Sequence, residues 1–151
     1  MPTYVLDTNI LIGYIRGAAY AAYVDKYYGP AKTPNIATVS IASVGEIYSL
    51  ALRKNWGEQK RKILSDLLRS IPATPIRHQS IIQKYAEIDA YNHGQHPEHR
   101  LPSSARSMSN NDIWIAATAA VLNATLLTTD RDFDHLNDLF LPVVYVDPAS
   151  V

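Results

Sequence analysis

Acidic side chains next to the expected strands and helix starts are the residues of this chain with the clearest capacity for chemistry. They are Asp7, Glu46, Asp112 and Asp130, and Asp132 lies two residues after Asp130. Carboxylates gathered without balancing Lys or Arg repel one another, and their pKa values rise unless a cation is supplied. Oxygen ligands in a chain without cysteine suit a hard ion such as Mg²⁺ or Mn²⁺. Such an ion makes water a better nucleophile and neutralises charge on a phosphate, so the set predicts metal-assisted phosphodiester hydrolysis.

The stretch Ser109–Phe133 must hold two of these acids in place. Its sequence predicts a helix that is apolar on nearly all sides, then a turn and a strand at Thr125–Thr128. Such a helix is buried instead of amphipathic. Asp112 opens the helix and Asp130 follows the strand, so the two meet only at the carboxyl edge of a parallel sheet, where α/β folds usually bind ligands.

Apolar runs and helical periodicity alternate along the rest of the chain. Strands are expected at Tyr4–Leu6, Ile36–Ser40, Thr125–Thr128 and Val143–Val146, with a minor one at Thr74–Ile76. Helices are expected at 9–16, 18–28, 43–54, 58–71 and 79–92, and a short one at 133–139. Strands separated by helices pair in parallel through right-handed crossovers. The prediction is a single α/β domain over residues 1–151, a three-layer α/β/α sandwich with a mainly parallel central sheet of four to five strands.

Periodicity alone places Glu46 away from the core. The apolar positions of its helix recur at helical spacing and define one inward face: Val44, Ile47, Tyr48, Ala51 and Leu52. Glu46 falls on the opposite side of that wheel, so by this criterion it is a solvated residue.

The charge balance of the whole chain points to no particular partner. Lys plus Arg equals Asp plus Glu at 14 each, although a basic run at 53–69 contrasts with an acidic one at 130–147. The absence of cysteine excludes disulfides and thiolate metal sites. No apolar run is as long as a membrane span, and the first residues lack the features of a signal peptide. We therefore expect a cytoplasmic protein that does not associate with a membrane.

Tyrosines recur on one side of the expected second helix. Tyr20, Tyr23 and Tyr27 are spaced i, i+3 and i+7, so the three rings share a face. Core or dimer packing is one explanation, and a groove for a partner helix, extended by Trp56 near the basic helix, is the other.

Residues 94–108 form the one clearly irregular stretch, and we expect a long surface loop there. His93, His96 and His99 are spaced by three, but without cysteine or a fourth ligand they make a weak zinc site. Contact of Arg100, Arg106 and the imidazoles with substrate phosphates is the favoured interpretation.

Each acid also has a purely structural explanation. Asp7 can cap the helix that follows it, and Ser109 with Asp112 matches a capping box. Asp130 and Asp132 fit a turn. Only their joint placement at one sheet edge favours a catalytic role.

Four segments, taken in order, carry a family resemblance. They are LDTNIL at 6–11, SVGEIYSLALR at 43–53, NNDIWIAATA at 110–119 and LLTTDRDF at 126–133. Followed by the strand VVYVDP, they resemble a PIN-domain ribonuclease, and more narrowly the bacterial toxin branch called VapC. The resemblance runs from Tyr4 to about Pro148. The loop at 94–108 is longer than the compact connection usual in that family.

The resemblance implies Mg²⁺- or Mn²⁺-dependent endonucleolytic cleavage of RNA. By position it assigns Asp7, Glu46, Asp112 and Asp130 to the metal site, and makes Asp132 an auxiliary acid. The polar side chains that it implies as ligand supports are Asn9, Thr128 and Thr129. It also implies a homodimer and a cognate antitoxin whose C-terminal segment covers the active site, with the tyrosine face as the candidate groove.

Three other functions compete with a toxin ribonuclease. A phosphatase with Asp7 as nucleophile requires a second acid two residues later, where this chain has Asn9. A catalytically silent PIN-like module that binds RNA or protein has no reason to keep mutually repelling carboxylates. A housekeeping RNA-processing nuclease would share the site but lack the antitoxin.

Overall fold

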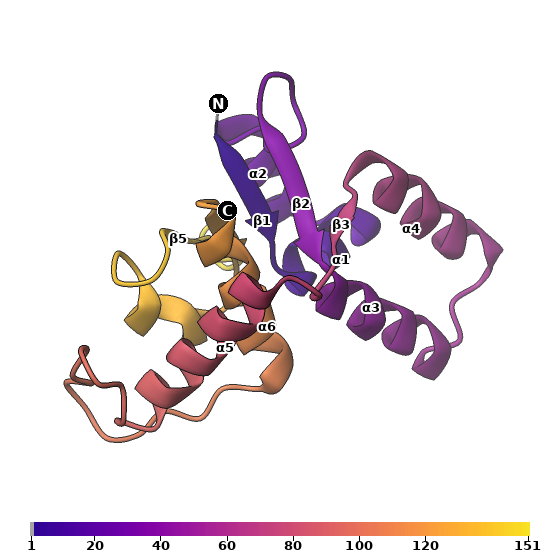
Figure 1. Cartoon of the computed structure of the whole chain (residues 1–151). Coiled ribbons are helices and arrows are strands. Elements are labelled where there is room, and N and C mark those ends of the chain that lie inside the picture. Colours follow the sequence, from indigo (N-terminus) through magenta and orange to yellow (C-terminus); the bar gives the residue numbers. More distant parts are fainter. Residues whose placement is uncertain (1) are drawn as a thin grey trace.

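Five short strands form one parallel sheet in the order β3-β2-β1-β4-β5. The computed structural model describes residues 2–151. The strands are β1 (Thr3–Leu6), β2 (Ile36–Ser40), β3 (Ala73–Thr74), β4 (Thr125–Thr128) and β5 (Val143–Tyr145). The helices are α1 (Thr8–Arg16), α2 (Ala19–Tyr27), α3 (Ile41–Arg53), α4 (Glu58–Ser70), α5 (Gln79–Asn92) and α6 (Asn110–Val121), with a 3₁₀ helix η1 (Arg131–Leu136). Figure 1 shows α5 and α6 on one side of the strands and α3 and α4 on the other.

Alternating side chains of the central strands divide the core into two layers. Val5 of β1 and Leu126 of β4 pack with α5, α6 and η1, whereas their neighbours Leu6 and Leu127 pack with α1 to α4. All four side chains are fully buried. Because successive residues of a strand point to opposite faces, a strand that is apolar at both positions must be covered on both sides. The predicted α/β/α sandwich is therefore confirmed.

The strand order places a topological switch point between β1 and β4. From β1 the chain moves to β2 and β3 on one side, then returns to β4 and β5 on the other. In open parallel sheets, ligands bind at the carboxyl ends of the strands that flank such a point. Asp7 directly follows β1, and Asp130 follows β4 by two residues. The fold thus brings together residues more than a hundred positions apart.

Helix ends follow local rules. Asp7 caps α1, Ser40 caps α3 and Ser109 caps α6, each accepting a hydrogen bond from a backbone N–H of the first turn. Gly17 ends α1 with φ +64°, a left-handed conformation that glycine adopts without strain. Four of the five predicted strand ranges and the range of α5 agree with the structure to within a residue.

The predicted inward face of α3 is partly wrong. Ile47 and Ala51 are fully buried, but the Tyr48 and Leu52 side chains are 51% and 71% exposed. The helix lies at the edge of the sheet and buries the narrow stripe that begins at Ser43. Glu46 is half-buried and accepts a hydrogen bond from Thr8 of α1.

Candidate active site

Asp7 anchors the site at the switch point. Its backbone N–H donates to the Leu127 carbonyl at 3.0 Å, which ties the end of β1 to β4. One carboxylate oxygen accepts from the Thr8 N–H at 2.8 Å, and the other accepts from the Thr128 hydroxyl at 2.7 Å. The side chain is 4% exposed. Asp7 therefore caps α1 and also directs a buried carboxylate to the sheet edge.

Thr128 joins Asp7 to the acids that follow β4. Its hydroxyl oxygen accepts from the Asp130 N–H at 2.9 Å while the hydroxyl donates to Asp7. Asp130 in turn caps η1, because its Oδ1 accepts from the Asp132 N–H at 2.8 Å. The two acids of the TTDRD segment are thereby held on one short turn. Asp7 and Asp130 can therefore cap helices and belong to the cluster of acids in one and the same side-chain conformation.

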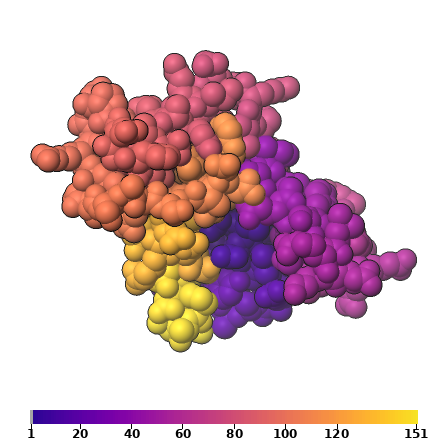
Figure 2. Space-filling model, turned by 90° about the horizontal axis from the view of Figure 1, so that it is seen from below, coloured from indigo at the N-terminus to yellow at the C-terminus, as the bar shows by residue number. Residues whose placement is uncertain are grey.

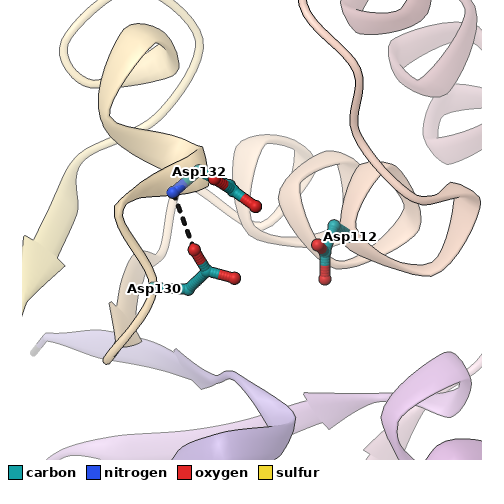
Figure 3. Close-up of side chains that lie close together, drawn as sticks. All are labelled: Asp112, Asp130 and Asp132. Atoms are coloured by element: carbon teal, nitrogen blue, oxygen red, sulfur yellow. Dashed lines mark hydrogen bonds between the residues drawn. The ribbon is translucent and has the colours of Figure 1, made fainter.

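Asp112 approaches the same place from the first turn of α6. Ser109 accepts its backbone N–H at 3.1 Å, which is half of the predicted capping box. Figure 3 shows the three carboxylates of Asp112, Asp130 and Asp132 gathered between the start of α6 and the turn into η1. One oxygen of each lies within 4.8 Å of the others. The parallel sheet thus brings the start of the helix and the end of the strand together, as the sequence required.

Glu46 joins the site from α3. Its Oε1 accepts from the Thr8 hydroxyl at 3.1 Å, and the side chain is half-buried. The prediction from periodicity that Glu46 is solvated is wrong, because the wheel ignores the neighbouring helix α1. Thr8 was missed altogether: it contacts two of the acids, its N–H binding Asp7 and its hydroxyl binding Glu46. The one sequence signal for Thr8 is its position directly after Asp7.

Burial and neighbouring carboxylates raise the pKa values of Asp7 and Asp112. Burial raises the pKa of Asp7 from 3.8 to about 7, with further increases from the charges of Asp112 and Glu46 against the lowering effect of the Thr128 and Thr8 hydrogen bonds. Burial raises the pKa of Asp112 to about 6, and the charges of Asp130, Glu46 and Asp132 add to it. Burial also raises the pKa of Glu46. The five acids therefore form one electrostatic unit.

The donor set fits a hard divalent cation. Asp112, Asp130 and Asp132 offer carboxylate oxygens alone, in a chain without cysteine. Mg²⁺ and Mn²⁺ prefer such ligands. A bound cation would offset the repulsion between the neighbouring carboxylates, because its positive charge stabilises their ionised forms. Asp7 and Glu46 lie beside this group of three and add negative charge to it.

The supporting polar residues differ in position. Thr128 is buried inside the hydrogen-bond network of the acids. Asn9 lines a cleft of about 400 Å³ together with Thr8 and Glu46. Thr129 is half-buried on the turn that leads to Asp130. Viewed from the carboxyl edge of the strands, the start of the chain (indigo) lies between α3 (magenta), the region of α6 (orange) and the C-terminal segment (yellow), as Figure 2 shows.

The predicted tyrosine face divides into separate roles. The Tyr20 ring packs over Gly13, and its hydroxyl donates to the Asn9 carbonyl at 2.8 Å, so it fastens α2 to α1. The Tyr23 and Tyr27 rings contact each other with centroids 4.5 Å apart, and Tyr27 is 60% exposed. Trp56 is 7% exposed and belongs to the core beneath α4, with the Lys60 ammonium over its ring. Its burial corrects its assignment to a surface groove, which leaves Tyr23 and Tyr27 as candidates.

The predicted irregular stretch at 94–108 contains no helix or strand. His96 and His99 contact each other and the Phe140 ring, with centroid separations of 4.7 to 5.9 Å. The edge-on packing against the Phe140 ring gives His96 and His99 a structural role. No helix within residues 2–151 combines the length and the apolar character needed to cross a membrane.

Comparisons with known proteins agree with this architecture. The family model described as PIN domain matches residues 4–139. The structure of VapBC2 from Rickettsia felis, bound to a DNA fragment from its promoter, has a TM-score of 0.73 at 22% identity, covering 96% of this chain and 99% of that one. VapBC-1 from nontypeable Haemophilus influenzae has a TM-score of 0.73 at 23% identity, covering 95% and 97%. VapBC-5 from Mycobacterium tuberculosis, a member of a family of toxin-antitoxin systems, has a TM-score of 0.64 at 18% identity, covering 97% and 100%. Among curated proteins, no sequence matches this chain.

Proposed function

This chain belongs to the PIN domain family, and we propose that it is a metal-dependent endoribonuclease that acts as the toxin of a VapC-type toxin-antitoxin pair. The observation that supports this function best is the convergence of Asp112, Asp130 and Asp132, with one oxygen of each within 4.8 Å, at the switch point of the sheet. Solved structures similar to this chain over at least 97% of their own length include VapBC proteins, one of them described as a member of a family of toxin-antitoxin systems, which supports the toxin assignment.

The chain's own residues position the charge that the reaction requires. Asp112, Asp130 and Asp132 would hold Mg²⁺ or Mn²⁺, with Asp7 and Glu46 contributing charge beside them. When bound, the cation lowers the pKa of water and neutralises charge developing on the scissile phosphate. Thr128 and Thr8 keep the carboxylates in place through hydrogen bonds of 2.7 to 3.1 Å. Because these groups are fixed before substrate arrives, little reorganisation accompanies the reaction.

Cleavage of total tRNA and rRNA by the purified protein tests the proposal. We expect discrete fragments with Mg²⁺ or Mn²⁺, none with EDTA, and none from Asp112→Asn, which removes a ligand charge but keeps the side-chain shape. Asp7→Asn should likewise abolish cleavage while the protein remains folded by circular dichroism. Ser65→Asn, an exposed polar position on α4, is the control for a neutral surface change.

Two outcomes would redirect the assignment. Absence of cleavage by folded, partner-free protein with either metal would favour a silent PIN-like module that binds RNA or protein. Metal-dependent cleavage that spares growing cells, with no antitoxin gene next to this one, would favour a housekeeping RNA-processing nuclease. In both cases Asp7 and Asp130 would keep their capping roles.

We further propose that an antitoxin covers the surface formed by Tyr23 and Tyr27 on α2. Tyr27 is 60% exposed and its ring contacts that of half-buried Tyr23, and tyrosines are enriched where proteins bind each other. Tyr23→Arg should weaken binding of the cognate antitoxin at least tenfold, measured by isothermal titration calorimetry. Tyr48→Arg, at an exposed tyrosine of α3, is the matched control. Equal affinities of the two variants would exclude this surface, and unfolding of Tyr23→Arg would assign the ring to the core.

The homodimer expected for this family is a further proposal. Sedimentation equilibrium of the partner-free protein would test it, since a single species of 16.8 kDa would identify a monomer.

A further inference from the structure

Two clefts lie on either side of the start of α6. The first, which we call the α1–α3 cleft, has a volume of about 400 Å³. It is lined by Thr8, Asn9, Ile12, Glu46, Arg53 and Asn111, among others. The second, which we call the α5–loop cleft, has a volume of about 370 Å³. It is lined by Asp89, Asn92, His93, Arg106, Met108 and Asn110, among others. Clefts of this size hold ligands as large as a nucleotide.

Consecutive residues of α6 separate the two clefts. Asn110 lines the α5–loop cleft and Asn111 lines the α1–α3 cleft. The next residue, Asp112, carries one of the clustered carboxylates. A linear ligand that occupied both clefts would therefore pass over the first turn of α6 and across the acids.

Each cleft contains one arginine. Arg53 lies in the α1–α3 cleft, two turns along α3 from Glu46. Its Nε donates to the Ser49 hydroxyl at 3.3 Å. Arg106 lies in the α5–loop cleft on the last part of the 94–108 loop, where its backbone N–H donates to the Asn92 carbonyl at 2.8 Å. Within residues 2–151 neither guanidinium forms an ion pair with a carboxylate. Both are exposed, so their charge is available to an anionic ligand.

Electrostatics places Arg106 near the acids. Its charge helps to lower the pKa of His135, after the larger effect of burial, while Asp132 and Asp134 act in the opposite direction on the same imidazole. His135 also bonds Asn92 at 2.6 Å at the back of the cleft. Arg106 therefore lies near η1, the helix that carries Asp132 and His135.

Both clefts combine the cation with apolar walls. Ile12 and Leu50 line the α1–α3 cleft, and Met108 and Ile113 line the α5–loop cleft. Single-stranded nucleic acids bind where basic side chains contact the phosphate backbone and unstacked bases pack against the protein. The bases of a duplex are stacked on one another and cannot enter such clefts. Asp89 supplies the carboxylate among the residues that line the α5–loop cleft, and its Oδ1 lies 3.7 Å from His93 Nδ1. A phosphate would therefore approach the Arg106 side of that cleft.

We propose that a single-stranded RNA crosses the start of α6 with the scissile phosphate at the acids, one flanking nucleotide in each cleft, and Arg53 and Arg106 each neutralising one flanking phosphate. This inference rests on the ribonuclease function proposed above. It assigns a substrate role to the irregular loop and to the outer end of α3.

The salt dependence of binding measures each phosphate contact separately. Affinity of a fluorescein-labelled single-stranded RNA of mixed sequence would be measured by anisotropy at several NaCl concentrations, in EDTA and in the Asp112→Asn background, which prevents cleavage. Each phosphate contact with a single strand contributes about 0.7 to the slope of log K against log salt. We expect Arg53→Gln and Arg106→Gln each to reduce the slope by about 0.7 and the double variant to reduce it by about 1.4. Each single variant should also weaken binding about three- to tenfold at low salt.

Matched arginines outside the clefts serve as controls. Arg77→Gln removes an exposed charge just before α5, and Arg69→Gln removes one from α4; neither residue lines either cleft. With the metal present and Asp112 intact, Arg53→Gln and Arg106→Gln should raise KM more than they lower kcat, while both controls keep the original KM.

The outcomes separate this inference from the function on which it rests. Cleavage and binding by the unsubstituted protein, with slopes that Arg53→Gln and Arg106→Gln change no more than the controls, would overturn the strand path and leave the ribonuclease standing. Loss of slope in only one variant would limit the path to that cleft and overturn it as stated. Failure of the unsubstituted protein to bind or cleave RNA would overturn both.

Discussion

At the scale of single residues, the hydroxyl of Thr128 is the centre of the site. It donates to Asp7 and accepts from the Asp130 N–H, so one buried side chain fixes acids from two strands. A hydrogen bond to the charged form of a carboxylate lowers its pKa, and here it opposes the effect of burial on Asp7. The availability of ionised Asp7 at neutral pH therefore depends on Thr128.

Thr128→Val should shift the pH dependence of cleavage. Without the donor, the pKa of Asp7 rises above its value of about 7, so a higher pH is needed to ionise it. We expect the ascending limb of cleavage rate against pH to move upward by about 1 unit, at saturating Mg²⁺, with partial recovery of activity at pH 9.

Thr118→Val is the control for this experiment. Thr118 is equally buried, but its hydroxyl donates at 2.8 Å to the Trp114 carbonyl of its own helix, away from the acids. Both variants should lose about 1 kcal/mol of stability, because each deletes a buried hydrogen bond. A shift of the pH profile of the same size in both would show that the effect comes from stability and not from Asp7.

At the scale of elements, two helical glycines allow α1 and α3 to be compared directly. A Cβ added at Gly13 of α1 would lie 2.3 Å from the Tyr20 ring, whereas a Cβ at Gly45 of α3 would meet nothing within 4 Å. Alanine stabilises a helix interior over glycine by about 1 kcal/mol. The close packing of α2 on α1 therefore requires Gly13, and no steric requirement exists at Gly45.

Gly45→Ala should raise the free energy of unfolding by about 1 kcal/mol, measured by urea denaturation. Gly13→Ala should instead lower the free energy of unfolding by about 1–2 kcal/mol relative to the unsubstituted protein, because Tyr20 must move and lose its hydrogen bond to the Asn9 carbonyl. Equal stabilisation by the two substitutions would contradict the packing of α2 described here.

At the scale of the whole molecule, the acidic site weakens the metal-free fold. The pKa of Asp7 rises from 3.8 to about 7 and that of Asp112 to about 6 in the folded protein. Folded protein then binds more protons than unfolded protein, so stability is highest below pH 4 for these groups and is lost as the pH rises to about 7. A divalent cation that binds only the folded state restores stability by mass action.

This gives a prediction for thermal or urea unfolding in EDTA and in Mg²⁺. Addition of Mg²⁺ should stabilise the protein more at pH 8 than at pH 5, because the ligands must be ionised to bind it. Asp112→Asn should reduce the Mg²⁺ effect and flatten the pH dependence in EDTA, since one repelling charge is gone. A stabilisation by Mg²⁺ that is independent of both pH and Asp112 would argue against a cation at these carboxylates.

Much of this protein follows from its sequence alone. The apolar runs determined β1, β2 and β4, because a strand buried on both faces must be apolar at successive positions. The polar residues that end these runs identified Asp7 and Asp130, and Ser109 with Asp112 identified the start of α6, because caps satisfy backbone groups within a few residues of themselves. These features depend on local hydrogen bonding and burial, which a linear pattern records.

Only the tertiary structure decided how the elements meet. The adjacency of β1 and β4 depends on which strands pair, and it is this pairing that joins Asp7 to Thr128. Glu46 turns inward because α1 lies beside α3, and Thr8 becomes its partner for the same reason, whereas the helical period of α3 alone predicted the opposite. Trp56 and Tyr27 are both aromatic residues of helical regions in the sequence. Only the structure places Trp56 in the core and Tyr27 at the surface, because burial depends on every neighbouring element. The two clefts beside α6 likewise arise between segments distant in sequence, so no pattern within any one of them could reveal that Arg53 and Arg106 line clefts on either side of the start of α6.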